Sequence, residues 1–166
     1  MQQGLAGLVF AALAIASGAN PSELNVPGSI RPESPAVRAL IARGLERSQT
    51  FRDLVRRLDA TDVVVYVRFT PPCNGRVPAC LLWGSSDRTH RRLLIKVDRF
   101  GRSENELTAL VAHELQHASE VASAPDITDI ASFQVWFAAH GRRGWHGFET
   151  DRAGEMTKKV MAELIQ

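Results

Sequence analysis

The stretch SENELTALVAHELQHASEVA, residues 103–122, predicts the helix around which the rest of the chain is organised. Ser103 can cap the first turn with its hydroxyl, and Glu106, three residues later, completes a capping box. Apolar residues follow at helical spacing: Leu107, Leu110 and Val111. We therefore expect a helix that begins at a defined residue, buries one face and runs towards Val121.

The same stretch contains HELQH, in which His113 and His117 are four residues apart. On a helix this spacing places both imidazoles on one face, so that they can reach the same ion. Catalytic zinc takes three protein ligands and a water, and Glu114 follows the first histidine, where it can act as general base towards that metal-bound water. The alternative, a pair of histidines on a solvated face, is disfavoured by the apolar neighbours Val111, Ala112 and Leu115.

A third zinc ligand has to come from elsewhere in the chain. A last helix is predicted over residues 148–165, and we expect Glu149 in its first turn to point at the metal. A carboxylate that merely stabilises the helix dipole is the alternative reading of Glu149. His146 is the second candidate for the third ligand, and Glu155 is the next.

Two further roles are predicted close to the metal. Glu120, three residues after His117, is poorly placed to bind the metal itself but can support a ligand by a hydrogen bond. Hydrolysis of a peptide also needs a donor for the developing negative charge on the carbonyl oxygen. His146, three residues before Glu149, is the first candidate for this catalytic role. Three other residues are further candidates: His140, Arg143 and Tyr66.

Outside the central helix, the patterns predict a small α+β domain. Ser34 and Pro35 begin a helical region that continues to Leu58 and is divided by Gly44 and residues 48–50. Three strands are predicted: Val63–Phe69, Cys80–Trp83 and Arg92–Val97, with a turn at residues 84–87. Because their connections are too short for crossover helices, we expect a small antiparallel sheet. Another helix is predicted over residues 127–139 and a loop over 141–147.

The beginning of the chain predicts export. Residues 4–19 are apolar or small and carry no charge, and small residues precede Asn20, as a signal-peptide cleavage site requires. We predict a cleavable signal peptide over residues 1–19, an exposed Pro-containing linker over 20–33, and one domain over 34–166. The expected location is periplasmic or extracellular, with no stable membrane span after cleavage. A buried N-terminal helix or a retained anchor is the alternative.

Cys73 and Cys80, the two cysteines of the chain, stand in the stretch PPCNGRVPACLLW. In an exported protein such an isolated pair is most simply a disulfide that closes a loop, worth roughly 2–3 kcal/mol in the chain-entropy model. Metal ligation by the cysteines is the alternative, but a second CxxC or a histidine at zinc-finger spacing is missing.

The overall composition is that of a globular protein, with 45% hydrophobic and 23% charged residues. The net charge is only +2, and the basic residues are spread in small pairs without interleaved aromatic residues. These features argue against nucleic acid as a partner.

The HELQH helix followed by a helix that carries a glutamate resembles the zincin metallopeptidases, and the glutamate makes the chain similar to their gluzincin branch. The strings VAHELQHASEVA and FETDRA together resemble a group of small bacterial exported proteins with the same two motifs. The resemblance covers about residues 63–165. It implies a zincin-like fold, in which a small sheet packs on the HExxH helix and an edge strand, either Arg92–Val97 or Cys80–Trp83, aligns a peptide or protein substrate.

We therefore predict an exported zinc metallopeptidase with Glu114 as general base. A non-peptidase zinc hydrolase and a non-catalytic, zinc-containing binding or structural protein are the alternatives. The small size leaves little room for a second lobe, which favours a shallow site for short or flexible peptides, or a partner protein that completes the site. Glu114 itself argues against a purely structural zinc, which has no use for that carboxylate.

Overall fold

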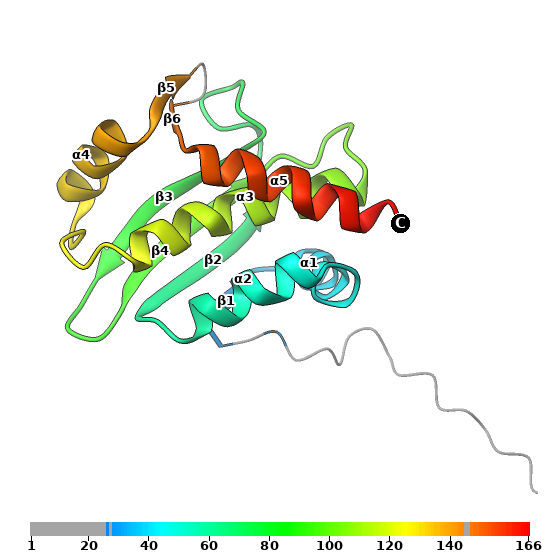
Figure 1. Ribbon diagram of the computed structural model, residues 1–166, viewed down its shortest axis with the longest axis horizontal. Helices are drawn as coiled ribbons and strands as arrows, with labels where there is room; N and C mark the ends of the chain where they lie inside the picture. The colour runs from blue at the N-terminus through cyan, green and yellow to red at the C-terminus, as the bar shows by residue number, and fades with distance from the viewer. Residues whose placement is uncertain (1–25, 27, 145–146) are drawn as a thin grey trace, which may run out of the picture.

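The structure of the protein is a computed structural model that describes residues 26, 28–144 and 147–166 (Figure 1). The predicted signal peptide and most of the predicted linker lie outside these residues. In chain order the described elements are β1 (Ile30–Pro32), α1 (Pro35–Arg47), α2 (Gln49–Asp59), β2 (Val63–Phe69), β3 (Ala79–Ser86), β4 (Arg91–Val97), α3 (Glu104–Ala122), α4 (Ile130–His140), β5 (Arg142–Gly144), β6 (Gly147–Glu149) and α5 (Asp151–Leu164).

The larger sheet is mixed and has the strand order β1-β2-β4-β3, while β5 and β6 form a separate hairpin. β2 pairs in parallel with β1 and with β4, whereas β3 is antiparallel to β4 and lies at the edge. Alternate residues of β2 are buried, namely Val63, Val65 and Val67, so one face of the sheet carries the core. The chain is an α+β protein, as predicted, and its small sheet is mixed.

The prediction of a purely antiparallel sheet is wrong for β2 and β4. It was based on connections too short for crossover helices, which do not exclude a parallel pair separated by a third strand in the chain. Instead, residues 70–78 carry β3 past the place of β4 to the edge of the sheet, and the turn at Asp87–His90 returns β4 between the other two strands. Two reversals of direction leave β2 and β4 parallel without a helical crossover.

Two predicted boundaries also differ from those in the structure. Residues 30–32, part of the predicted linker, form strand β1, because Ile30 packs into the core at 1% exposure and pairs with Val65. The turn predicted at residues 84–87 belongs largely to β3. Gly84 interrupts the pairing with β4 at a bulge, where an added Cβ would lie 2.9 Å from the carbonyl oxygen of Arg92.

The helix caps agree with the sequence. Ser34 caps α1, Ser48 separates α1 from α2 by capping the latter, and Ser103 and Glu106 form the capping box of α3. α4 begins later than predicted, because Asp129 forms its own capping box with Ser132. The longest described helix is not long and apolar enough to cross a membrane.

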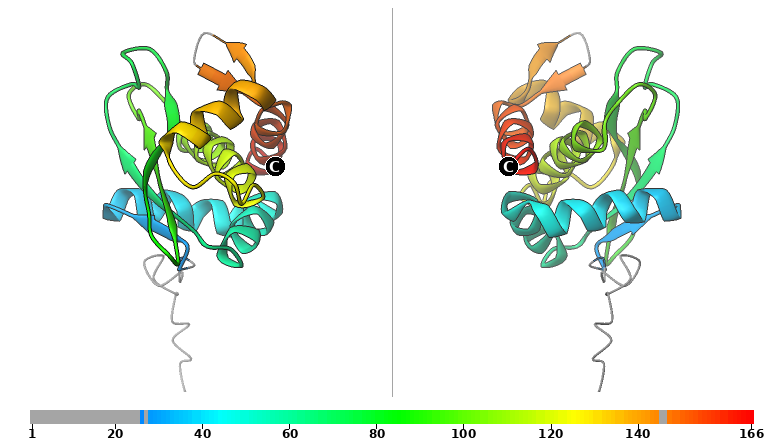
Figure 2. Two further views of the ribbon diagram at one scale, coloured as in Figure 1. Left: turned by 90° about the vertical axis from the view of Figure 1, so that its left-hand side faces the viewer. Right: turned by 90° about the vertical axis from the view of Figure 1, so that its right-hand side faces the viewer.

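Helix α3 is the centre of the molecule. It lies against the sheet on one side and against α5 on the other (Figure 2). Because neighbours surround it, α3 is buried on most of its circumference rather than along a single stripe. Its buried set includes polar residues beside the apolar ones: Thr108, Glu114, Gln116, His117 and Glu120.

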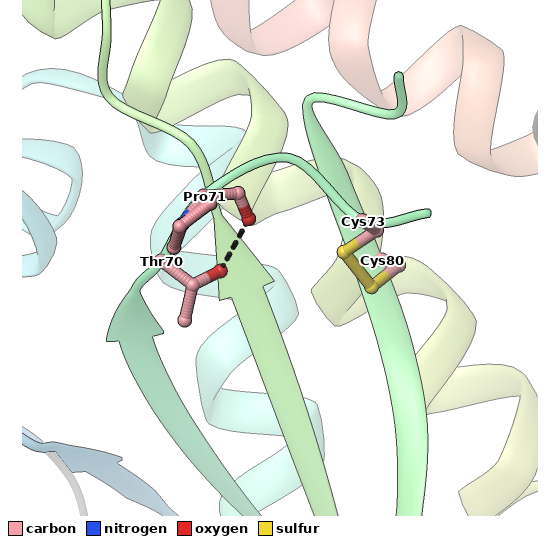
Figure 3. Close-up of a disulfide and its surroundings, with 4 residues drawn as sticks. All are labelled: Thr70, Pro71, Cys73 and Cys80. Atoms are coloured by element: carbon pink, nitrogen blue, oxygen red, sulfur yellow. Dashed lines mark hydrogen bonds between the residues drawn. A yellow bond between two sulfur atoms is a disulfide. The ribbon is translucent and has the colours of Figure 1, made fainter. Parts of the chain in front are cut away.

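The disulfide between Cys73 and Cys80 is present and ties the connection after β2 to the start of β3 (Figure 3). Beside it, the hydroxyl of Thr70 donates a hydrogen bond to the carbonyl oxygen of Pro71. The disulfide closes a loop that contains Asn74 and Gly75, two residues with positive φ angles. A disulfide is consistent with an oxidising, exported location.

The end of α3 is held by Arg91, the first residue of β4. Its guanidinium forms two hydrogen bonds with Asp62, of 2.6 and 2.7 Å, and donates to the carbonyl oxygens of Val121 and Ala124 at 2.8 Å. The hydrogen bond from Arg91 holds the pKa of Asp62 below its usual value, against the effect of burial. One side chain therefore satisfies carbonyls at and just beyond the end of α3 and fixes that helix to the sheet.

We expect Arg91→Met to lower the free energy of unfolding by about 2–4 kcal/mol, because it leaves Asp62 and several helix-terminal carbonyl groups without their partner. Urea denaturation of the variant and the wild type measures this difference. Arg56→Met is the matched control, since Arg56 is 73% exposed in its ion pair with Asp53 and should change stability by less than about 0.5 kcal/mol. Equal effects of the two substitutions would contradict the role of Arg91.

Candidate metal centre

Three side chains converge at the middle of α3: those of His113, His117 and Glu149. One ligand atom from each lies within 4.8 Å of the other two. The Nε2 atoms of His113 and His117 are 2.8 and 3.7 Å from the same carboxylate oxygen of Glu149. These three residues form a group that could hold a metal ion. They are the three that the sequence pattern selected as ligands.

The two histidines reach one point because they stand one turn apart on α3, as their spacing predicts. Glu149 lies on a different element from the one predicted. It is not in the first turn of a helix but is the last residue of β6, and α5 begins only at Asp151. Thr150 caps α5 by accepting a hydrogen bond from the backbone N–H of Ala153. Because the helix begins only after this cap, Glu149 remains in the extended β5–β6 hairpin.

His117 is oriented from behind by Glu120. The Nδ1 atom of His117 lies 3.0 Å from a carboxylate oxygen of Glu120, and both side chains are buried. The other carboxylate oxygen of Glu120 accepts a hydrogen bond of 2.7 Å from the hydroxyl of Thr150. Because a carboxylate only accepts, Nδ1 of His117 carries the proton and Nε2 faces the centre of the group. Glu120 thus lies where the sequence predicted a supporting residue.

The charges at the centre require a positive partner. Burial lowers the pKa of His117, but its hydrogen bonds to Glu120 and Glu149 raise it more, to about 9. Burial raises the pKa of Glu149, but hydrogen bonds from His113 and His117 bring it well below its usual range. In the metal-free protein a proton on His117 therefore balances the carboxylate. Two imidazole nitrogens and one carboxylate oxygen around a shared point also suit a divalent cation in place of that proton.

Glu114 lies beside this group and is 5% exposed. Burial raises its pKa to about 7, although the neighbouring histidines and a hydrogen bond from the backbone N–H of Leu81 act in the opposite direction. Leu81 is on β3, so the edge strand approaches the motif directly. A carboxyl group that titrates near neutral pH beside a metal group has the properties of a proton acceptor and donor.

A cleft of about 270 Å³ opens onto Glu114, His117 and Glu149. One wall is the edge strand β3 together with the disulfide loop, and the opposite wall is α4. The side chains that line it are mainly apolar or aromatic, among them Val77, Leu81, Leu82, Phe133, Phe137 and Phe148. Phe137 also packs edge-on against His117, with ring centroids 5.3 Å apart. The metal group is thus reached through an apolar entrance.

The other predicted site residues that the structure describes lie apart from the cleft lining. His140 ends α4, stacks on Trp136 and is exposed. Tyr66 alternates with the buried valines of β2 and so faces away from α3. Glu155 is exposed on α5 and is not a member of the metal group. His146, the predicted catalytic donor and second choice of ligand, lies outside the described residues, and so does the side chain of Arg143.

Three contacts of this site were not predicted from the sequence. Thr150 supports Glu120, Phe137 packs against His117, and the hydroxyl of Thr157 on α5 lies 2.9 Å from Nδ1 of His113. Thr157 follows Glu149 by eight residues, on the helix that begins just after it, so a search for hydroxyl residues on the predicted last helix would have found it. Phe137 has no comparable signal in the sequence, because α4 is apolar on all sides.

In comparisons with known proteins, no family model matches the chain, and no curated protein or solved structure matches it.

We expect the purified protein to retain one divalent metal ion per chain after dialysis and Glu149→Gln to lose it, because the amide removes the anionic ligand of the group. Elemental analysis of the dialysed proteins measures this. Glu155→Gln is the matched control on α5 and should keep the metal, as should His146→Ala. Loss of metal from His146→Ala but not from Glu149→Gln would reverse the choice of third ligand.

Metal affinity should depend on pH in a defined direction. Since the pKa of His117 is raised to about 9, a metal ion must displace its proton at lower pH. The apparent association constant should rise roughly tenfold per pH unit up to about pH 9 and level off above it. Competition with a chelator of known proton affinity, at several pH values, gives the slope. A flat profile between pH 6 and 9 would show that no proton on His117 competes with the metal in this range.

Proposed function

We propose that this protein is a zinc-dependent hydrolase, and specifically a peptidase, in which His113, His117 and Glu149 hold the zinc ion and Glu114 is the general base. The observation that carries the proposal is the position of Glu114. A carboxyl group with a pKa of about 7 stands beside a three-ligand group at the inner end of a cleft.

Zinc is the ion that this donor set suits best. Two imidazoles and one carboxylate are borderline ligands that zinc accepts, whereas magnesium and calcium prefer oxygen ligands alone. Among the described residues, the group contains three protein ligands and not four. Three ligands with one open position are typical of catalytic zinc, while structural zinc is usually held by four.

The residues of the chain divide the chemistry between them. A zinc ion held here would act as a Lewis acid and lower the pKa of a water molecule to about 7. Glu114 would accept a proton from the attacking water and return it to the leaving amine, which its raised pKa favours near neutral pH. Glu120 and Thr150 would keep His117 oriented throughout.

The cleft favours a peptide as substrate. β3 is an edge strand, and an edge can pair with an extended chain through backbone hydrogen bonds. Leu81 of β3 and Glu114 line the same cleft, and β3 contacts α3, so a segment lying along β3 would pass beside the metal group. A cleft of about 270 Å³ with apolar walls suits a short segment with apolar side chains rather than a folded domain.

The disulfide supports a place for this activity outside the cytoplasm, where the bond persists. We therefore propose an exported peptidase that acts on short or flexible peptide segments.

We expect Glu114→Gln to bind one zinc ion per chain as the wild type does and to lose hydrolysis by a factor of about 10² or more, because the amide cannot accept the proton. The measurement is cleavage of a mixed peptide library, read by mass spectrometry, beside the zinc content of each protein. Glu155→Gln should cleave like the wild type.

The outcomes separate the alternatives. A fully active Glu114→Gln would remove Glu114 from the mechanism. A zinc-loaded wild type that leaves every peptide intact but cleaves amide or ester compounds would indicate a different hydrolase. A zinc-loaded protein inactive on all of these would indicate a binding or structural role.

A further inference from the structure

Helix α5 contacts the metal group a second time, through Thr157. Its hydroxyl oxygen lies 2.9 Å from Nδ1 of His113 and 3.1 Å from the carbonyl oxygen of Ala153, one turn earlier in the same helix. The side chain of His113 is 16% exposed, so this contact is largely screened from water. Thr157 does not belong to the HELQH motif. It lies on the same face of α5 as the buried apolar residues Ala153, Val160 and Leu164, and it is the polar residue in that row.

The direction of these hydrogen bonds follows from counting protons. A threonine hydroxyl has a single hydrogen, and the carbonyl oxygen of Ala153 can only accept. Nε2 of His113 lies 2.8 Å from the carboxylate of Glu149, which only accepts, so in the metal-free protein Nε2 donates to Glu149. A metal ion held by the group would take the place of that proton, and the neutral ring would then carry its proton on Nδ1. The hydroxyl of Thr157 can accept from this Nδ1–H because it can donate its own hydrogen to Ala153.

We propose that Thr157 is a positioning residue of the metal centre: it holds His113 in the tautomer and ring orientation that direct Nε2 at the metal. This inference rests on the proposed zinc site but not on the reaction assigned to it. His113 would otherwise be free to place the proton on either nitrogen and to rotate about its side-chain bonds.

Both histidines are then oriented by hydrogen bonds that depend on threonine hydroxyl groups from one segment of the chain. Residues 149–157 provide the third ligand Glu149, the hydroxyl of Thr150 that holds Glu120 behind His117, and the hydroxyl of Thr157 behind His113. Thr157 is on α5, Thr150 is its N-cap and Glu149 directly precedes that cap, so docking α5 on α3 places the third ligand and both supports together.

The test compares zinc affinity in Thr157→Val, Thr157→Ser and the wild type, by competition for Zn²⁺ with a chromophoric chelator. Valine has the shape of threonine but no hydroxyl, and we expect it to weaken zinc binding by about 10- to 100-fold. Serine keeps the hydroxyl and its helical hydrogen bond, and should stay within about threefold of the wild type.

Thr108→Val is the matched control. Thr108 is a buried threonine of α3 whose hydroxyl also donates to a carbonyl one turn back, that of Glu104, at 2.7 Å, but no histidine contacts it in the described structure. Its substitution should alter thermal stability as much as that of Thr157 while leaving zinc affinity unchanged. Melting temperatures of the metal-free proteins show that each variant folds.

The outcomes distinguish this inference from the proposed function. Equal zinc affinities of Thr157→Val and the wild type, or a loss of affinity in Thr157→Ser as large as in Thr157→Val, would overturn the role of Thr157 and leave the zinc hydrolase intact. Zinc binding with the expected ranking, but without hydrolysis, would support Thr157 and reject the hydrolase. If the wild type bound no zinc, both the role of Thr157 and the proposed hydrolase would be rejected. Long-range nitrogen NMR of the zinc-loaded wild type should show a protonated Nδ1 on His113, and the opposite tautomer would also overturn the inference.

Discussion

The constraint on which this structure depends is the burial of charged and polar side chains on a helix that is enclosed by other elements. Glu114, His117 and Glu120 lie on α3 between the sheet and α5, and each is about 5% exposed. Ionised groups in such a place are strongly destabilising unless they are paired. His117 and Glu120 are paired with each other, Glu149 of β6 faces His117, and Thr150, the cap of α5, donates to Glu120. For Glu114, burial raises the pKa, which favours its neutral form.

This arrangement explains why the candidate site is built on regular elements. Two ligands come from the middle of α3, the supporting hydroxyls come from α5 or its cap, and the edge of the cleft is a strand. Elements of this kind hold side chains more tightly than loops do. The end of α3 is fastened to β4 by Arg91, so the helix that carries the histidines is fixed relative to the strand next to β3. The proposed chemistry needs this precision, because a proton acceptor works only within hydrogen-bonding reach.

The parts that were predicted correctly depend on residues close together in sequence. The caps at Ser34 and Ser103, the division of the first helical region near residues 48–50, the strand over 63–69 and the disulfide all follow from local patterns. The errors concern relations between distant segments. The parallel pairing of β2 with β4, the recruitment of residues 30–32 into the sheet, and the placement of Glu149 on a strand depend on where the chain returns after a loop. A local pattern carries no information about that return.

By itself, the sequence determined the central helix, its capping box and the single face on which His113 and His117 meet, because a spacing of four residues on a helix leaves no other arrangement. It also determined which residue types could complete the site. Only the tertiary structure decided that Glu149, and not Glu155, reaches that face, and that Thr157, Thr150 and Phe137 surround it. The physical reason is that these contacts arise when α4, α5 and the β5–β6 hairpin pack on α3, and packing between segments is set by the whole core rather than by any one stretch.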